Sequence, residues 1–332
     1  MFKFIKRKFI RNKSSFKDPE KVKRDSSRYN EWIKNSDIPI IDQSELYKVK
    51  EIGKGGHGTV YSAEHRGEMI VYKEIKDNKI RKFVNEVKQH MTVNENDNII
   101  KFKGIILSSG KYMIVLQYAN GGTLEKYLKN KISDDIYEIS WTELIPIVEQ
   151  IIFGLQHLHE KNIAHGDLHP KNILVINDDN DRFNKVVISD FGSASKLDDS
   201  LISIHGKYLT IEYADPQFFI NPQMIEPNFK SDIYSLGVIL WELTSGIRPF
   251  SEVLNKIALP NHILKGKREK KVSGTPSRYV KLYKRCWSSN PKKRPEIKEI
   301  LCKLRKSKDE KIIISNKVRG YGGNEVNFRY KP

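Results

Sequence analysis

The spacing of apolar residues changes about one third of the way along the chain. Before residue 118, short segments alternate between apolar and polar positions or are rich in β-branched residues, which is typical of strands. Five strands are predicted, at 47–52, 60–64, 69–75, 105–107 and 111–117. A helix around 80–91 interrupts them, and Ser109-Gly110 is expected to be a hairpin turn. The front of the chain is therefore predicted to be a small sheet with a helix.

From Thr123 onward, apolar residues recur every three or four positions, as in an amphipathic helix. Helices are predicted at 124–129, 141–159, 231–244, 279–286 and 296–306. The polar run 177–184 is interpreted as a turn between two short strands. A short helix and an extended connector are expected within 29–41. A folded domain is expected to begin near Leu46. A strand-rich front and a helix-rich back predict two lobes.

Length and composition are those of an ordinary soluble globular protein. The chain has 332 residues, 38% of them hydrophobic and 30% charged, enough for one bilobed unit or two modest domains. Its apolar stretches fall far short of the ~18 residues of a membrane-spanning helix, so no span is predicted. Two cysteines, Cys286 and Cys302, are too few for a disulfide framework. This favours a reducing, cytoplasmic setting, with the nucleus as an alternative.

The net charge of +18 is concentrated at the two ends. Residues 1–28 carry eleven Lys or Arg against three Asp or Glu, and residues 303–332 carry nine against three. Such runs are commonly solvated and disordered. Phe2, Ile5 and Phe9, however, fall near one helical face. The alternatives to a disordered end are therefore peripheral contact with an anionic membrane, contact with an acidic partner, and a targeting peptide. Nucleic acid is an unlikely partner, since no recognised binding module accompanies the charge.

The polar residues with the clearest chemistry lie between 165 and 192. Residues 165–172 read His-Gly-Asp-Leu-His-Pro-Lys-Asn, and Asp190-Phe191-Gly192 begins eighteen residues after Asn172. In-line phosphoryl transfer needs an Asp to orient a hydroxyl, and further oxygen ligands for the metal ions that neutralise charge on the phosphate. The order and spacing therefore indicate phosphate transfer from a nucleotide.

A glycine-rich segment, Gly53-Lys54-Gly55-Gly56-His57-Gly58, joins the first two predicted strands. Because a strand rather than a helix follows it, it is not a dinucleotide fingerprint. Glycines 53, 55 and 58 let backbone amides approach phosphate oxygens. Lys73 on the next strand can reach the α- and β-phosphates, and Glu86 in the helix is placed to pair with it. Alone, these features would be a common turn and an ordinary ion pair.

Together these motifs resemble a eukaryotic-type protein kinase catalytic domain over about residues 46–305. Asp232 and the pairs Cys286-Trp287 and Arg294-Pro295 extend the match, and the two pairs together resemble the tyrosine-kinase-like group. The resemblance implies an α+β bilobal fold, with a small antiparallel N-lobe sheet and helix at 46–118 and a larger, mainly α-helical C-lobe at 119–305. A partly disordered basic extension at 1–45 and a basic tail at 306–332 would flank it.

The resemblance implies ATP and Mg²⁺, or Mn²⁺, as cofactors. Asp167 would accept or orient the substrate proton, Lys171 would stabilise the transferring group, and Asn172 and Asp190 would ligate the metal. Asp232 would anchor the catalytic loop. The nucleotide would contact the glycines, Lys73 and six further residues, namely Val60, Val71, Leu116, Gln117, Ala119 and Leu174. Ordinary core packing is the alternative for the apolar walls Val60, Val71 and Leu174.

Three departures from the family pattern carry expectations. Gly166 stands where most members have Arg, so activation is not expected to depend on phosphorylating 193–210. Gln217 occupies the position that the resemblance pairs with Arg294, and losing the charge should loosen the substrate-binding segment. His90 falls where the family packs an apolar side chain against Phe191, which should lower basal activity or make it depend on a partner.

Two positions bear on the substrate hydroxyl. His169 replaces a Lys common in serine/threonine kinases, and the Lys171 spacing is more like tyrosine kinases. Thr210 matches the Thr of serine/threonine kinases and weighs more, because it lies where the substrate side chain must pass. The prediction is a serine/threonine protein kinase of intracellular signalling, with dual specificity as an alternative. The rivals are a small-molecule phosphotransferase of the aminoglycoside or choline type, and a pseudokinase scaffold.

Overall fold

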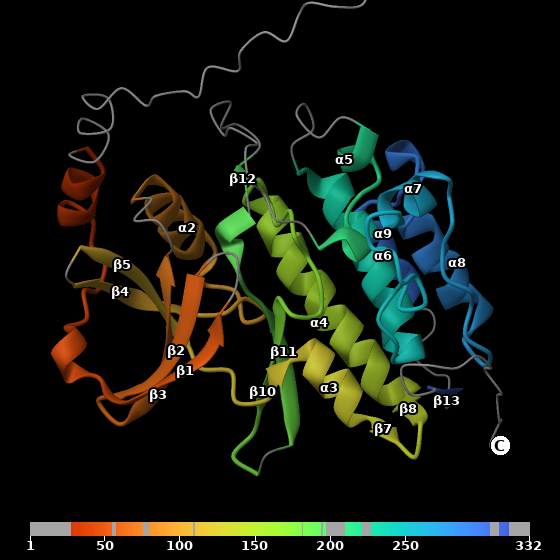
Figure 1. Cartoon of the computed structure of the whole chain (residues 1–332), viewed down its shortest axis with the longest axis horizontal. Coiled ribbons are helices and arrows are strands. Elements are labelled where there is room, and N and C mark those ends of the chain that lie inside the picture. The colour runs from red at the N-terminus through yellow and green to blue at the C-terminus, as the bar shows by residue number, and fades with distance from the viewer. Residues whose placement is uncertain are drawn as a thin grey trace, which may run out of the picture.

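The computed structural model shows the chain as two lobes (Figure 1), which confirms the predicted α+β bilobal class. It describes residues 28–54, 58–75, 80–108, 110–180, 182–193, 195–196, 210–220, 227–305 and 312–318. The predictions for Gly55 and for most of the two basic ends lie outside these residues. Within the described ranges, no helix combines the length and apolar character that a membrane span requires.

The smaller lobe is a five-stranded antiparallel sheet in the order β1-β2-β3-β5-β4. Its strands are β1 (Tyr47–Lys54), β2 (Gly58–His65), β3 (Glu68–Ile75), β4 (Phe102–Ser108) and β5 (Lys111–Gln117). Helix α2 (Ile80–Val93) packs against the sheet through Phe83, whose ring lies 5.1 Å from that of Tyr112. The five predicted strands and this helix are therefore confirmed, with ends that extend slightly further.

The larger lobe is mainly helical and is built around one buried helix. Its helices are α3 (Leu124–Asn130), α4 (Trp141–Glu160), α5 (Gln217–Ile220), α6 (Phe229–Ser245), α7 (Leu259–Leu264), α8 (Ser277–Cys286) and α9 (Ile297–Arg305). Every residue of α6 from 231 to 245 is buried, α4 and α8 pack against it, and α9 packs against α4 and α8 (Figure 1). Asn228 caps its start in a capping box with Ser231, and Gly246 ends it in the left-handed conformation.

Short strands bring distant polar residues together at the border between the lobes. β10 (Ile173–Asn177) pairs with β11 (Phe183–Ile188) and with β6 (Gly122–Thr123), while β9 (Ile163–Ala164) pairs with β12 (Ser195–Lys196). Ile173 lies opposite Ile188 in this antiparallel hairpin. Asn172 precedes that pair and Asp190 follows it, so both are held at the same end of the hairpin.

Folded segments flank the predicted domain on both sides. Residues 28–34 are helical, as expected from the sequence, and Ile41 N–H donates to the Ile105 carbonyl at 2.8 Å, which joins the connector to β4. At the other end, β13 (Ile313–Lys317), which was not predicted, pairs with β8 (Ile136–Ser140), and β8 pairs with β7 (Ile132–Ser133). Ile33, Ile38 and Ile314 are buried in the main apolar core, so apolar burial fixes both segments to the domain.

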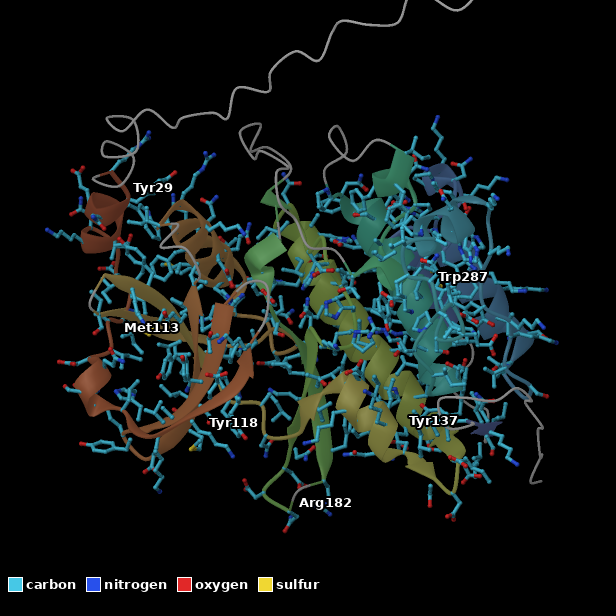
Figure 2. The ribbon with its side chains drawn as sticks, in the orientation of Figure 1. Tyr29, Met113, Tyr118, Tyr137, Arg182 and Trp287 are labelled. Atoms are coloured by element: carbon cyan, nitrogen blue, oxygen red, sulfur yellow. The ribbon has the colours of Figure 1, made fainter. Side chains whose placement is uncertain are left out.

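The β7-β8-β13 sheet completes the hydrogen bonding at the end of α6. The last carbonyls of a helix have no partner within the helix and need one elsewhere. The Tyr137 hydroxyl donates to the Leu243 carbonyl, and Asn316 Nδ2 donates to the Ser245 carbonyl, both at 2.8 Å. Figure 2 shows Tyr137 at this corner of the larger lobe. A side chain on Gly246 would collide with the Tyr137 ring, so glycine is required there.

Ile314 tests whether β13 belongs to the folded core. Its side chain is fully buried, whereas that of its neighbour Ile313 is 60% exposed. Ile314→Ala should lower the free energy of unfolding by about 2–4 kcal/mol through lost burial and the cavity left behind. Ile313→Ala should change it by less than about 0.5 kcal/mol. Urea unfolding of both variants measures this, and equal effects would contradict the assignment.

Candidate active site

Three charged side chains from three separate elements meet between the lobes. The Lys73 ammonium, on β3, lies 2.9 Å from Glu86 Oε1 on α2 and 2.7 Å from Asp190 Oδ1 beyond β11. Lys73 is 7% exposed and Glu86 is 5% exposed. The predicted Lys73–Glu86 contact is therefore present, and it forms one cluster with Asp190.

The electrostatics of this cluster favour a permanently charged lysine. Burial disfavours the ammonium form, but the carboxylates of Glu86 and Asp190 outweigh that effect, so the pKa of Lys73 is raised. Asp190 has a backbone φ of 63°, a conformation that non-glycine residues keep only where their surroundings hold it. The Gly192 N–H donates to Asp190 Oδ1 at 3.2 Å. The Lys73 ammonium is thus a fixed positive charge held between two carboxylates, in a site that screens charge poorly.

The loop that carries Asp167 is held from below by Asp232 on α6. Asp232 is 1% exposed, and its carboxylate accepts the backbone N–H groups of His165 and Gly166, each at 2.9 Å. His159 Nε2 lies 2.9 Å from the same carboxylate. Gly166 has a φ of 81°, in the region that favours glycine. The geometry matches the anchoring role expected of Asp232.

Asp167 is fixed by contacts from both sides of the loop. Its Oδ1 accepts the Thr210 backbone N–H at 3.2 Å, and its carbonyl accepts from Asn172 Nδ2 at 2.9 Å. Asp167 and Asn172 are 9% and 8% exposed, whereas Lys171 is exposed. The predicted residues Asp167, Asn172 and Thr210 are therefore brought together, with Thr210 joined through its backbone.

The sequence analysis considered His169 only for substrate specificity and did not predict its contact with Asp167. Its Nδ1 accepts the Lys171 backbone N–H at 3.2 Å, so the proton of the neutral ring is on Nε2. Nε2 lies 3.6 Å from Asp167 Oδ2, and the side chain is 9% exposed. The signal that could have found it is its position two residues after Asp167 in a tight loop.

The predicted nucleotide-binding residues line one side of the sheet and the passage between lobes. Val60 lies opposite Lys73, and Val71 lies opposite Leu116, so these four side chains share one face. Gln117 ends β5, and Figure 2 shows the next residue, Tyr118, where the chain leaves the sheet. The other residues are distributed as follows: Gly53 on β1, Gly58 on β2, Ala119 beyond β5, and Leu174 on β10.

Close approach of backbones explains one of the predicted glycines. Any side chain on Gly58 would collide with the Glu74 carbonyl of the neighbouring strand. Glycine is therefore required at position 58 by the packing of the strands, in addition to the predicted contact with phosphate. Gly55 lies outside the described residues, as do most residues of the 193–210 segment whose phosphorylation was considered.

His90 packs as a neutral ring between two aromatic side chains. Its ring lies 4.6 Å from that of Phe191 and 5.9 Å from that of Phe102. Burial, together with the nearby Lys73 charge, lowers the pKa of His90 to about 3. Neither ring nitrogen has a hydrogen-bond partner among the residues that the structure describes. The packing of α2 on Phe191 therefore contains two desolvated polar atoms.

The expectation that the Arg294 pairing loses its charge was wrong. Arg294, 2% exposed, is paired with the carboxylate of Asp215, whose Oδ1 accepts from Nη2 at 2.8 Å and whose Oδ2 accepts from Nη1. Gln217 instead donates to the Ser289 carbonyl at 3.1 Å. The negative charge has moved two residues upstream, so the segment keeps a bidentate, charge-assisted anchor.

The Asp215–Arg294 pair gives a direct stability test. Asp215→Asn leaves a buried guanidinium without its counter-charge and should destabilise the fold by about 3–5 kcal/mol. Gln217→Ala removes a neutral hydrogen bond at a half-buried site and should cost about 1 kcal/mol. Urea unfolding midpoints compare the two variants, and the reverse ranking would show that Gln217 is the main anchor.

The burial of neutral His90 predicts a pH dependence of stability. An unfolded histidine gains a proton near its ordinary pKa of 6.5, while folded His90 stays neutral until about pH 3. The folded state is therefore destabilised progressively as pH falls from 6.5 towards 3. His90→Leu should remove this contribution and should raise stability at neutral pH by about 1–3 kcal/mol, because two unpaired polar atoms are lost. Thermal unfolding at several pH values measures both effects, and unchanged acid sensitivity would count against them.

Comparison with known proteins gives the same class of domain. The sequence profile of the family described as protein tyrosine and serine/threonine kinase matches residues 46–304. These residues include both lobes and all the site residues above. The chain therefore belongs to the protein kinase family.

Individual relatives share less than a third of their positions with this chain. Cyclic GMP-binding protein C of Dictyostelium discoideum is 30% identical over 314 residues, covering 81% of this chain and 11% of its own length. Mitogen-activated protein kinase kinase kinase 13-A of Xenopus laevis is 29% identical over 272 residues, covering 81% of this chain and 26% of its own length. Megakaryocyte-associated tyrosine-protein kinase of Mus musculus is 29% identical over 267 residues, covering 80% of this chain and 50% of its own length. The chain thus spans at most half of the length of these relatives.

Proposed function

We propose that the chain is an ATP-dependent protein kinase that phosphorylates serine or threonine hydroxyls of proteins. The observation that carries the proposal is the buried Lys73 ammonium, 2.9 Å from Glu86 and 2.7 Å from Asp190. A fixed cation beside a metal-binding carboxylate suits a triphosphate, whose charge is the main obstacle to phosphoryl transfer. Asp167 and Asn172 lie on the adjoining loop, where a hydroxyl acceptor would have to approach.

The residues present fit ATP and Mg²⁺. The Asp190 carboxylate and the Asn172 amide oxygen are hard oxygen donors of the kind that Mg²⁺ or Mn²⁺ binds. Asn172 Nδ2 is engaged by the Asp167 carbonyl, which orients the amide for ligation through oxygen. Lys73 would hold the α- and β-phosphates, and Val60, Val71, Leu116 and Leu174 would enclose the adenine. Bound metal would supply charge neutralisation at the phosphate oxygens.

Asp167 would act on the acceptor hydroxyl. The Thr210 N–H bond to Oδ1 fixes the carboxylate, and the His169 Nε2–H faces Oδ2. A carboxylate held in this way can take up or orient the hydroxyl proton as the phosphoryl group transfers. Lys171, exposed on the same loop, would stabilise the transferring group.

Preference for serine and threonine rests on Thr210 and its place beside Asp167. Relatives of both kinds exist, since one of those above is named a tyrosine-protein kinase. We infer serine/threonine specificity, with dual specificity as the alternative. The substrates would be proteins within intracellular signalling, in the cytoplasm, and the basic ends would contact an anionic membrane or an acidic partner.

A transfer assay tests this function. The purified chain, labelled ATP and Mg²⁺ are incubated with a generic protein, a Lys73→Met copy of the chain and small aminoalcohols. Label is expected on protein serine or threonine after phosphoamino-acid analysis. Asp167→Asn should lower kcat by about 10²–10⁴-fold, because a positioned general base contributes that much. Asp179→Asn, an exposed carboxyl on the β10–β11 turn, is the matched control and should keep full activity.

Three results would overturn parts of the proposal. Label on the aminoalcohol alone would indicate a small-molecule phosphotransferase. Binding of ATP without transfer to any acceptor would indicate a pseudokinase scaffold. Label on tyrosine alone would leave a protein kinase but contradict the inference from Thr210.

A further inference from the structure

The substrate segment that begins at Thr210 continues directly into a buried carboxylate. The Thr210 N–H bonds to Asp167, and a single 3₁₀ turn, Ile211–Tyr213, follows it. Glu212 lies in this turn, two residues after Thr210. A protein substrate that presents its hydroxyl to Asp167 in an extended conformation advances about 3.3 Å per residue. The side chains that flank the hydroxyl must therefore pass close to the neighbours of Thr210.

Two cations from a separate part of the larger lobe hold the Glu212 carboxylate. Its Oε1 lies 3.2 Å from Arg248 Nη2 and 3.4 Å from Lys256 Nζ. Lys256 also donates to the Phe250 carbonyl at 3.2 Å, which fixes the loop that carries it. The side chains of Arg248 and Lys256 are 36% and 50% exposed, whereas that of Glu212 is 7% exposed. At this point on the surface, a substrate would meet the cations and not the carboxylate.

Apolar packing holds the loop of Lys256 against the substrate segment. Residues on both sides of Lys256 form a small buried cluster, namely Phe250, Leu259 and Ile263, and Ile211 packs against it. Ile211 directly precedes the carboxylate that Lys256 contacts. Figure 1 shows α7, which contains two members of the cluster, beside α5 at one end of the larger lobe. The two cations are thus placed by apolar contacts as well as by charge.

The other carboxylates of this region add little negative charge to the substrate segment. Glu242 of α6 is 3% exposed, and its Oε2 accepts the Tyr213 hydroxyl at 2.6 Å. Burial raises the pKa of Glu242 to about 8, so most molecules hold it protonated at neutral pH. Glu252, in the loop before α7, lies near Glu269. Glu212 therefore supplies most of the negative charge at the substrate segment.

The guanidinium of Arg248 has more donors than contacts. Its Nη2 faces Glu212, while its Nε has no hydrogen-bond partner among the residues that the structure describes. Glu125 of α3 also acts on Arg248, but Lys129 lies 3.5 Å from that carboxylate. Lys171 adds a further exposed cation on the catalytic loop. The charge left over beside the acceptor position is therefore positive.

We propose that Arg248 and Lys256 make this kinase select protein substrates that carry an anionic side chain, a carboxylate or a phosphate, within a few residues of the acceptor hydroxyl. The inference rests on the proposed kinase function and names the substrate class of that site. Complementary charge favours encounter and binding, whereas like charge excludes a partner. Basic residues at the same positions are disfavoured, because the buried Glu212 carboxylate already has two cationic partners.

Matched peptides test the selection. Four peptides share one serine acceptor and carry Asp, phosphoserine, Ala or Arg at the flanking positions. The kcat/KM for the Asp peptide should exceed that for the Arg peptide about tenfold at low ionic strength, and the ratio should fall as salt is added. A still higher value for the phosphoserine peptide would identify phosphate as the preferred anion. A ratio of Asp to Arg at or below one would overturn the proposal.

Substitutions separate these two cations from the basic ends of the chain, which attract any acidic peptide. Lys256→Glu should lower the Asp-to-Arg ratio to about one, and Arg248→Gln should lower it about threefold. Lys103→Glu is the matched control, because Lys103 also pairs with a glutamate, Glu68 at 2.6 Å, but lies on β4 of the smaller lobe. It should keep the ratio of the unsubstituted chain. Because each ratio is taken within one variant, a general loss of activity cancels, and equal ratios in Lys256→Glu and Lys103→Glu would overturn the assignment.

Peptide binding keeps the inference separate from the proposed function. Fluorescence anisotropy of the labelled Asp and Arg peptides measures affinity without phosphoryl transfer. If no peptide is phosphorylated, the kinase proposal fails, while anisotropy still decides the charge selection. Tighter binding of the Asp peptide to the Lys103→Glu chain than to the Lys256→Glu chain would support the selection. Equal affinity of the two chains for this peptide would contradict it.

Discussion

The rest of the structure depends on one buried ammonium shared by two carboxylates. Lys73, Glu86 and Asp190 come from the sheet, from α2 and from the border of the larger lobe, so the cluster exists only when all three parts are in place. Removing one member would leave a desolvated charge without compensation, which is much more costly than losing an exposed ion pair. The same contact therefore couples the lobes mechanically and sets the charge of the site between them.

Buried carboxylates organise the larger lobe in a comparable way. Asp232 accepts the backbone N–H groups of His165 and Gly166 in the loop that carries Asp167, and Asp215 binds the guanidinium of Arg294. In each case a rigid helical lobe holds a loop through charge-assisted hydrogen bonds rather than through apolar contact. Loops have few buried apolar side chains to fix them, so polar anchors of this kind decide where Asp167 and Thr210 lie.

The sequence predicted what periodicity and fixed spacing encode. Long amphipathic helices and the sheet were found, and so was the meeting of Lys73 with Glu86, because their spacing belongs to a strand followed by a helix. β13 and the helices α5 and α7 were missed, since a few residues give too short a pattern. The Asp215 pairing was missed because it depends on which of two nearby side chains reaches Arg294, and spacing alone does not distinguish them. The contact between His169 and Asp167 was missed because it depends on the conformation of a tight loop.

Helix α2 is where stability and activity are most closely joined. Its cleft side carries Glu86 and the imperfectly satisfied His90. Helix α2 buries one side in the apolar core, whereas α6 is buried on all sides from Ser231 to Ser245, so the loss of a single contact should displace α2 more readily than α6. Control over phosphoryl transfer is therefore expected to act on α2 and its surroundings, while the larger lobe serves as the fixed support.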